Sequence, residues 1–193
     1  MAGTSVNKGT IFRHERFESR HVAPRNVDVW TPPGYDRRGA ADFPVVYLHD
    51  GQNLFRASEA FGGVDWGISG TMSRLIGDRL TREAIVVGIW NTENRLGEYM
   101  PKKAAADLVG QVSGLPAELK SEEITSDGYL EFLVGELKPF IDSTYRTKTD
   151  RQDTFVMGSS MGGLISLYAI CEYPSVFGGG ACISTHWPAC GGV

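Results

Sequence analysis

Apolar stretches of strand length alternate along this chain with stretches in which apolar residues recur at helical spacing. Residues 43–48 and 84–90 are nearly continuous apolar runs, which is typical of strands covered on both faces. Residues 68–80 lie between them and carry an apolar stripe made of Ile68, Met72, Leu75, Ile76 and Leu80. This β-α-β order predicts an α/β fold with a mostly parallel sheet.

The remaining elements extend this pattern on both sides. Residues 11–17 and 26–30 alternate apolar and polar positions, and the segment Thr31–Tyr35 then interrupts the chain with prolines and a glycine, so we expect an edge hairpin or meander. Further along, we expect a helix at about 127–145, a strand at 154–157, a helix at 161–173 and a strand near 181–184. Residues 91–126 show no clear period, and connections of this length are usually functional or disordered. The pattern predicts about six strands flanked by helices in one domain, residues 1–193.

The sequence Gly158-Ser159-Ser160-Met161-Gly162 matches the Gly-x-Ser-x-Gly pattern of a nucleophile turn. The match is weak alone, but residues 154–157 have the pattern of a buried strand and the residues after the turn have helical spacing, which is the required setting. Only Ser160, and not Ser159, has glycine two positions away on both sides. The alternative is a glycine-rich strand-to-helix turn with a helix-capping serine.

The neighbours of Ser160 suit this chemistry. Glycines at positions 158 and 162 remove side chains that would clash at a sharp turn. The N–H group of Met161 would lie at the positive end of the following helix, where it can stabilise a developing oxyanion. The turn therefore predicts acyl transfer through Ser160.

Longer motifs resemble a known family. Residues 25–35 (RNVDVWTPPGY), 46–55 (VYLHDGQNLF) and 158–163 (GSSMGG) are similar to esterases related to enterochelin esterase and esterase D, and so are residues 87–91 (VGIWN), 98–101 (EYMP) and 184–188 (STHWP). The resemblance covers nearly the whole chain. It implies an α/β-hydrolase fold and hydrolysis of carboxylic esters, in a group that includes acetyl- and feruloyl-type esterases.

Carried over by position, the resemblance makes Ser160 the nucleophile. It makes the loop from His49 to Gln52 the second half of an oxyanion hole, in which backbone N–H groups of Gly51 and Gln52 supplement that of Met161. The residues agree, because a strand that ends in Asp-Gly leaves amides unpaired at the carboxyl edge of the sheet, where ligands bind in open α/β folds. The alternative is an ordinary Asp-Gly turn.

The catalytic partners of the serine are harder to place. In this fold the acid and the histidine follow the serine along the chain, and residues 161–193 contain Glu172 and His186 but no aspartate. The resemblance places both partners beyond Val193, so we expect a truncated chain that lacks the last strands of the usual eight. Serine without a base is a poor nucleophile, and His186 is the substitute base that we would name. The resemblance alternatively places His186 in the substrate pocket beside Trp187.

Two further residues begin the long connection at the edge where substrate is expected. Trp90 and Asn91 are candidate pocket residues, although Trp90 could equally belong to the core and Asn91 to a turn. Two functions are compatible with these features. The first is a serine carboxylesterase that hydrolyses short-chain or aryl esters through an acyl-Ser160 intermediate, with activity weakened by the absent acid and histidine. The second is a catalytically impaired hydrolase-like domain that binds ligands or a partner.

Composition limits the other classes of function. The formal net charge is −4 without a run of like charge, which disfavours nucleic-acid binding. No apolar run approaches the roughly 18 residues of a membrane helix, and no apolar leader begins the chain, so we expect a cytoplasmic protein without membrane association. We expect a small-molecule ester as partner and no cofactor or metal, because the three cysteines lack the spacing of a zinc site. Loss of the last strands would expose a sheet edge near 181–184, which predicts self-association.

Overall fold

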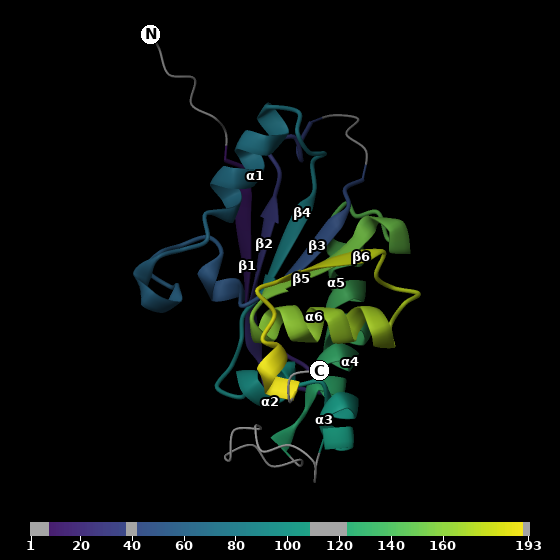
Figure 1. The fold of residues 1–193 in the computed structure, drawn as a ribbon. Helices are drawn as coiled ribbons and strands as arrows, with labels where there is room; N and C mark the ends of the chain where they lie inside the picture. The colour runs from purple at the N-terminus through teal and green to yellow at the C-terminus, as the bar shows by residue number, and fades with distance from the viewer. Residues whose placement is uncertain (1–7, 38–41, 109–122, 191–193) are drawn as a thin grey trace.

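The computed structural model describes residues 8–37, 42–108 and 123–190. A six-stranded sheet runs through them in the order β1-β2-β4-β3-β5-β6 (Figure 1). The strands are β1 (Thr10–Phe17), β2 (Arg25–Thr31), β3 (Val45–His49), β4 (Ile85–Ile89), β5 (Thr154–Ser159) and β6 (Gly179–Ile183). The β1–β2 and β2–β4 pairs are antiparallel, and the β3–β4, β3–β5 and β5–β6 pairs are parallel. The predicted antiparallel edge and mostly parallel sheet are both confirmed.

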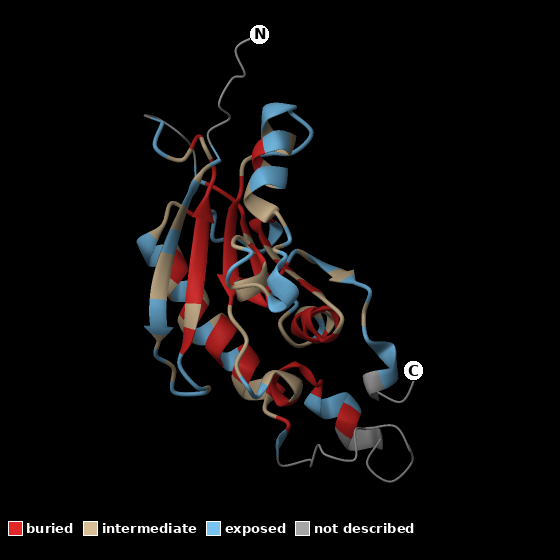
Figure 2. Cartoon of the chain, turned by 90° about the vertical axis from the view of Figure 1, so that its left-hand side faces the viewer, coloured by how far each residue is buried: buried red, intermediate tan, exposed pale blue. Residues whose placement is uncertain are grey.

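Burial along the strands follows their sequence pattern. Every residue of β4 is buried, and so is every residue of β3 except Val46, because both strands are apolar runs covered on two faces. The outermost strands β1 and β6 have exposed and half-buried residues instead (Figure 2). Since β3, β4 and β5 are parallel neighbours, their carboxyl ends meet at one edge of the sheet, which is the usual position of a ligand site.

Helices cover both faces of the sheet. They are α1 (Ile68–Gly77), α2 (Arg95–Tyr99), α3 (Lys102–Leu108), α4 (Ser126–Glu131), α5 (Lys138–Thr144) and α6 (Met161–Glu172), with a π-helical segment, η4 (Phe132–Leu137), joining α4 to α5. Helix α1 packs against a small cluster that contains Trp30, Leu48 and Val86. Residues from α4 to α6 pack on the other face, in the main core around Tyr47 and Val87. Short 3-10 helices are η1 (Gly51–Asn53), η2 (Phe61–Gly63), η5 (Arg151–Asp153) and η6 (Trp187–Cys190).

Two elements differ from the sequence-based expectation. Helix α1 ends at Gly77, and Leu80 is 70% exposed instead of packing on the sheet, because Arg79 adopts a left-handed φ of 57° that turns the chain away. The connection after β4 contains α2 and α3, which are too short for a hydrophobic period to reveal. Residues 109–122 of this connection lie outside the described residues.

The structure bears on two expectations, one about membrane association and one about self-association. None of the helices in the described ranges combines the length and the apolar character needed to cross a membrane. Strand β6 forms an outer edge of the described sheet, and Ile183 on this strand is 44% exposed. Self-association through this edge and a cytoplasmic location stay predictions.

Candidate active site

Ser160 lies at the sharp turn between β5 and α6. Its backbone angles are φ 58° and ψ −120°, a left-handed φ that residues other than glycine rarely adopt. The turn is tight enough that a Cβ added at Gly158 would collide with the carbonyl oxygen of Gly162. This crowding explains the glycine at position 158, and the strained backbone projects Ser160 out of the strand direction.

The backbone of Ser160 is held by hydrogen bonds from three directions. Its N–H donates to the carbonyl of Ile183 over 2.9 Å, and its own carbonyl accepts from Gly163 and Leu164 in the first turn of α6. The N–H of His186 also donates to that carbonyl, over 3.2 Å. The N–H of Met161 stands at the start of α6, where helix geometry offers no intrahelical acceptor and the positive end of the dipole favours negative charge.

The loop after β3 faces this turn. Asp50 adopts a left-handed conformation, with φ 60° and ψ 46°, and the 3-10 helix η1 follows it. A Cβ added at Gly51 would lie 2.5 Å from the carbonyl carbon of Gly88, so a larger residue cannot approach β4 this closely. The N–H groups of Gly51 and Gln52 belong to the first turn of η1 and have no intrahelical acceptor there.

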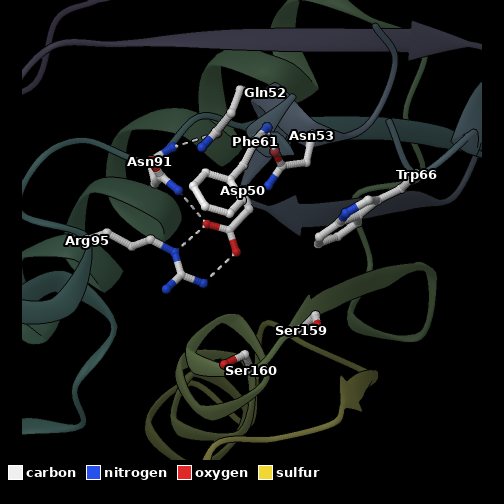
Figure 3. Close-up of a pocket in the computed structure, with 9 residues that line it drawn as sticks. All are labelled: Asp50, Gln52, Asn53, Phe61, Trp66, Asn91, Arg95, Ser159 and Ser160. Atoms are coloured by element: carbon white, nitrogen blue, oxygen red, sulfur yellow. Dashed lines mark hydrogen bonds and ion pairs between the residues drawn. The ribbon is translucent and has the colours of Figure 1, made fainter. Parts of the chain in front are cut away.

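Asp50 is the centre of a hydrogen-bonded group at the ends of β3 and β4. Its carboxylate accepts hydrogen bonds from Arg95 Nε over 2.6 Å and from Arg95 Nη2 over 2.8 Å. It also accepts one from Asn91 Nδ2 over 2.6 Å. The backbone N–H of Asn91 donates to Gln52 Oε1 over 3.2 Å. Figure 3 shows that these contacts tie the loop after β3 to the connection after β4.

A cavity of about 580 Å³ lies between the loop after β3 and the turn that carries Ser160. Ser159 and Ser160 lie on one side of it, and Asp50, Arg95 and Asn91 lie on the other (Figure 3). Because Asp50 and Arg95 neutralise one another, this wall offers hydrogen-bonding groups without a large net charge. A cavity of this size can hold a small molecule beside Ser160.

The sequence profile of the family described as "Putative esterase" matches residues 20–190. The chain belongs to this family. Among curated proteins, the uncharacterized protein YbbA of Bacillus subtilis is 30% identical over 93% of this chain and 62% of its own length. An endo-1,4-beta-xylanase/feruloyl esterase of Xylanibacter ruminicola is 24% identical over 90% of this chain and 21% of its own length. The chain thus spans less than two thirds of either relative.

Solved structures of similar fold agree with the esterase family. An IroE-like serine hydrolase from Shewanella oneidensis is 26% identical, with a TM-score of 0.64 over 93% of this chain and 51% of that protein. The enterobactin esterase FES from Shigella flexneri is 19% identical, with a TM-score of 0.63 over 93% of this chain and 37% of that protein. The sheet described above, with helices on both faces, is therefore an α/β-hydrolase fold.

Of the three substrate-pocket residues that the sequence motifs suggested, the structure places one at the cavity and two outside its lining. Trp90 is not among the residues that line the cavity, and its Nε1 donates to Asp28 Oδ2 over 3.0 Å. Trp187 lines a separate apolar cavity of about 280 Å³ beside α6. Asn91 does line the main cavity, although its side-chain amide is bound to Asp50.

The two histidines near the site differ in their surroundings. His186 is exposed, and within the described residues no hydrogen bond joins its imidazole to Ser160. His49 is completely buried, and its Nδ1 lies 2.8 Å from the hydroxyl of Tyr129. Burial lowers the pKa of His49 to about 4, which keeps this imidazole neutral near pH 7.

The cavity also contains residues that the sequence motifs did not suggest. Phe61 and Trp66 line it from the loop before α1 and are 92% and 39% exposed. Arg95 was hidden in a connection without hydrophobic period. One signal was present for each: the aromatic residues stand among glycines, and Arg95 follows the end of a strand that neighbours β3.

Proposed function

We propose that this chain forms the nucleophile side of a serine carboxylesterase that hydrolyses short-chain or aryl carboxylic esters. The left-handed backbone of Ser160 at the strand-to-helix turn, beside the cavity, is the observation that carries the proposal. Membership of the esterase family supports ester hydrolysis. Two proteins similar to this chain, a feruloyl esterase and an enterobactin esterase, support esters with an aromatic part.

The proposed mechanism begins at the turn that carries Ser160. Ser160 Oγ attacks the ester carbonyl, and its proton passes to a base. The oxyanion that forms is stabilised by the N–H of Met161 and by the N–H groups of Gly51 and Gln52 across the cavity. Collapse of the intermediate releases the alcohol, which takes up the proton, and leaves an acyl group on Ser160. Water then attacks the acyl-enzyme by the same route and releases the acid.

We propose His186 as the base available within this chain. Its backbone is hydrogen bonded to Ser160, so the two residues are neighbours at one edge of the sheet. The exposed imidazole must rotate toward Ser160 Oγ to accept its proton, and catalytic hydrogen bonds often tighten only when substrate is bound.

A second candidate function is a hydrolase-like domain that binds an ester or a partner without efficient turnover. One observation favours it. In the described part of the chain, no imidazole is hydrogen bonded to Ser160. A serine without an engaged base remains a weak nucleophile, so such a domain would bind a ligand but hydrolyse it slowly.

The two functions are separated by comparing this chain with Ser160→Ala in a p-nitrophenyl acetate assay. The esterase proposal expects Ser160→Ala to lose the activity and Ser159→Ala, which changes the adjacent cavity residue, to keep it. Labelling by a fluorophosphonate should likewise require Ser160. Equal hydrolysis by the chain and Ser160→Ala would overturn the esterase proposal. His186→Ala should reduce turnover as strongly as the loss of a general base does, about 100-fold or more.

A further inference from the structure

We propose that Asp50 and Arg95 are positioning residues. Their ion pair holds the loop of residues 50–52 in its active conformation, and Arg95 offsets the negative charge of the Asp50 carboxylate beside the oxyanion. The inference rests on the proposed function, because it concerns the N–H groups of Gly51 and Gln52 that are assigned to the oxyanion there. It adds two residues that do not touch the reacting atoms but determine whether those N–H groups face Ser160.

The backbone of Asp50 is in a left-handed conformation. Most residues with a side chain disfavour φ 60°; aspartate adopts it more readily than most, and contacts that hold its side chain select this conformation. Asp50 has such contacts, since both carboxylate oxygens are bound by Arg95 and one also by Asn91. Its side chain is 4% exposed, and charge-assisted bonds of this kind are stronger than neutral ones. The left-handed residue immediately precedes the two N–H groups, so its conformation sets their direction.

The helix that carries Arg95 is short and is held by a buried ion pair. Helix α2 has five residues, and it is held at its other end by the buried pair of Glu98 with Arg25. The Arg95 guanidinium lies 5.1 Å from the ring centre of Tyr99, whose hydroxyl accepts the N–H of Asp50 over 3.4 Å. These contacts fix the position of the Arg95 guanidinium relative to the Asp50 carboxylate.

The Asp50 carboxylate lies close to the N-terminus of α6. A Cβ added at Gly162 would lie 3.3 Å from Asp50 Oδ2, so the carboxylate stands over the first turn of α6. An unpaired carboxylate there would repel the oxyanion that the same helix end stabilises. Arg95 binds both carboxylate oxygens, and its hydrogen bonds to Asp50 raise the pKa of the guanidinium, which keeps its positive charge beside the carboxylate.

This role predicts an order of effects that a purely structural ion pair would not produce. Arg95→Met leaves the Asp50 carboxylate uncompensated beside the oxyanion and should lower kcat at least tenfold, with KM changed less than twofold. Asp50→Asn removes the charge and keeps an acceptor, so it should lower kcat less. Combining the two changes should recover part of the turnover that Arg95→Met loses.

The test measures kcat and KM for p-nitrophenyl acetate on the 193-residue chain, together with ¹⁵N order parameters of the Gly51 and Gln52 amides. The order parameters should be about 0.85 in the unaltered chain and should fall below about 0.6 in Arg95→Met. The control is Arg37→Met, which breaks the exposed Arg37–Glu83 pair far from the cavity and should change neither readout.

The outcomes distinguish this inference from the proposed function. If Ser160→Ala keeps full activity, the esterase proposal fails, and the order parameters alone decide the role of the ion pair. If Ser160→Ala is inactive while Arg95→Met keeps both kcat and the order parameters, the role of the ion pair is overturned and the esterase proposal stands. Should Arg95→Met not fold, Arg95→Lys serves instead, because it keeps the charge but cannot bind both oxygens, and its order parameters should still fall.

Discussion

Arg25 and Glu98 form a two-bond ion pair that is almost completely shielded from water. Arg25 Nη1 and Nη2 lie 2.8 Å and 2.6 Å from the carboxylate oxygens, and the two side chains are 1% and 2% exposed. The pair joins β2 to α2, and α2 carries Arg95 to the cavity. The position of Arg95 thus depends on a contact that Glu98, three residues along the same helix, makes with β2.

Replacing only one residue of this ion pair should destabilise the folded protein strongly. Arg25→Met leaves a buried carboxylate unpaired and should lower the free energy of unfolding by about 3–5 kcal/mol. The double variant Arg25→Met/Glu98→Leu replaces both charges with apolar groups and should lose much less. Urea unfolding of the four proteins in this cycle measures the difference. A double variant as unstable as the sum of the two single changes would contradict the assignment.

Gly51 should not tolerate a side chain. Gly51→Ala places a methyl group against the backbone of Gly88, so the loop must move, with an expected loss of about 1–3 kcal/mol of stability and of most turnover. Gly70→Ala is the matched control, because Gly70 lies in α1 with no atom within 4 Å of an added Cβ. Alanine there should stabilise the protein by about 0.5–1 kcal/mol. Thermal unfolding and the esterase assay compare the two.

Phe61 should contribute to substrate binding and hardly to folding. Phe61 is 92% exposed and lines the cavity, so Phe61→Ala should change stability by less than about 0.5 kcal/mol. An aromatic contact is worth about 1 kcal/mol, so KM for an aryl ester should rise roughly fivefold with kcat unchanged. An aliphatic ester of similar size is the control, and equal changes in KM for both would exclude a specific role for the ring.

His49 should make the protein less stable in mild acid. The unfolded imidazole has a pKa of about 6.5, whereas burial lowers the pKa to about 4 in the folded protein. Between these values the unfolded state binds a proton that the folded state does not, so the free energy of unfolding falls as the pH falls. The expected loss from pH 7 to pH 5 is about 2 kcal/mol. His49→Gln cannot titrate, and the difference between the two pH profiles in urea unfolding isolates this group.

The exposed edge of the sheet should promote association of two chains. Ile183 on β6 is 44% exposed, and unpaired strand edges invite pairing with another strand. Light scattering over a wide range of concentrations should therefore detect self-association, and Ile183→Lys should weaken it by placing a charge on the edge. A monomer at every concentration would show that this edge does not pair.

The central strands and the nucleophile turn could be predicted from sequence because their signals are local. The runs in β3 and β4 are apolar at almost every position, and Ser160 lies between two glycines with a strand before it and a helix after it. Each of these features depends on residues within a few positions of one another. The resemblance to esterases rested on the same short motifs.

The opposite wall of the cavity could not be predicted in this way. Arg95 meets Asp50 across 45 positions of the chain, and Glu98 meets Arg25 across 73. No periodicity signals such contacts, since they depend on which strands become neighbours. Trp90 illustrates the converse, because it follows a strand that ends at the cavity, but its side chain is directed to Asp28 instead.

The hydrogen bonds of Ser160 to Ile183 and His186 connect the turn mechanically to the outermost strand. A pull on β6 would be transmitted through one backbone bond to the Ser160 N–H, and release of the following segment would remove another bond from its carbonyl. Fraying of an edge strand usually affects only that strand. Fraying of β6 would also alter the backbone of Ser160, the residue proposed to attack the substrate. Whatever braces β6 therefore also braces the geometry of Ser160.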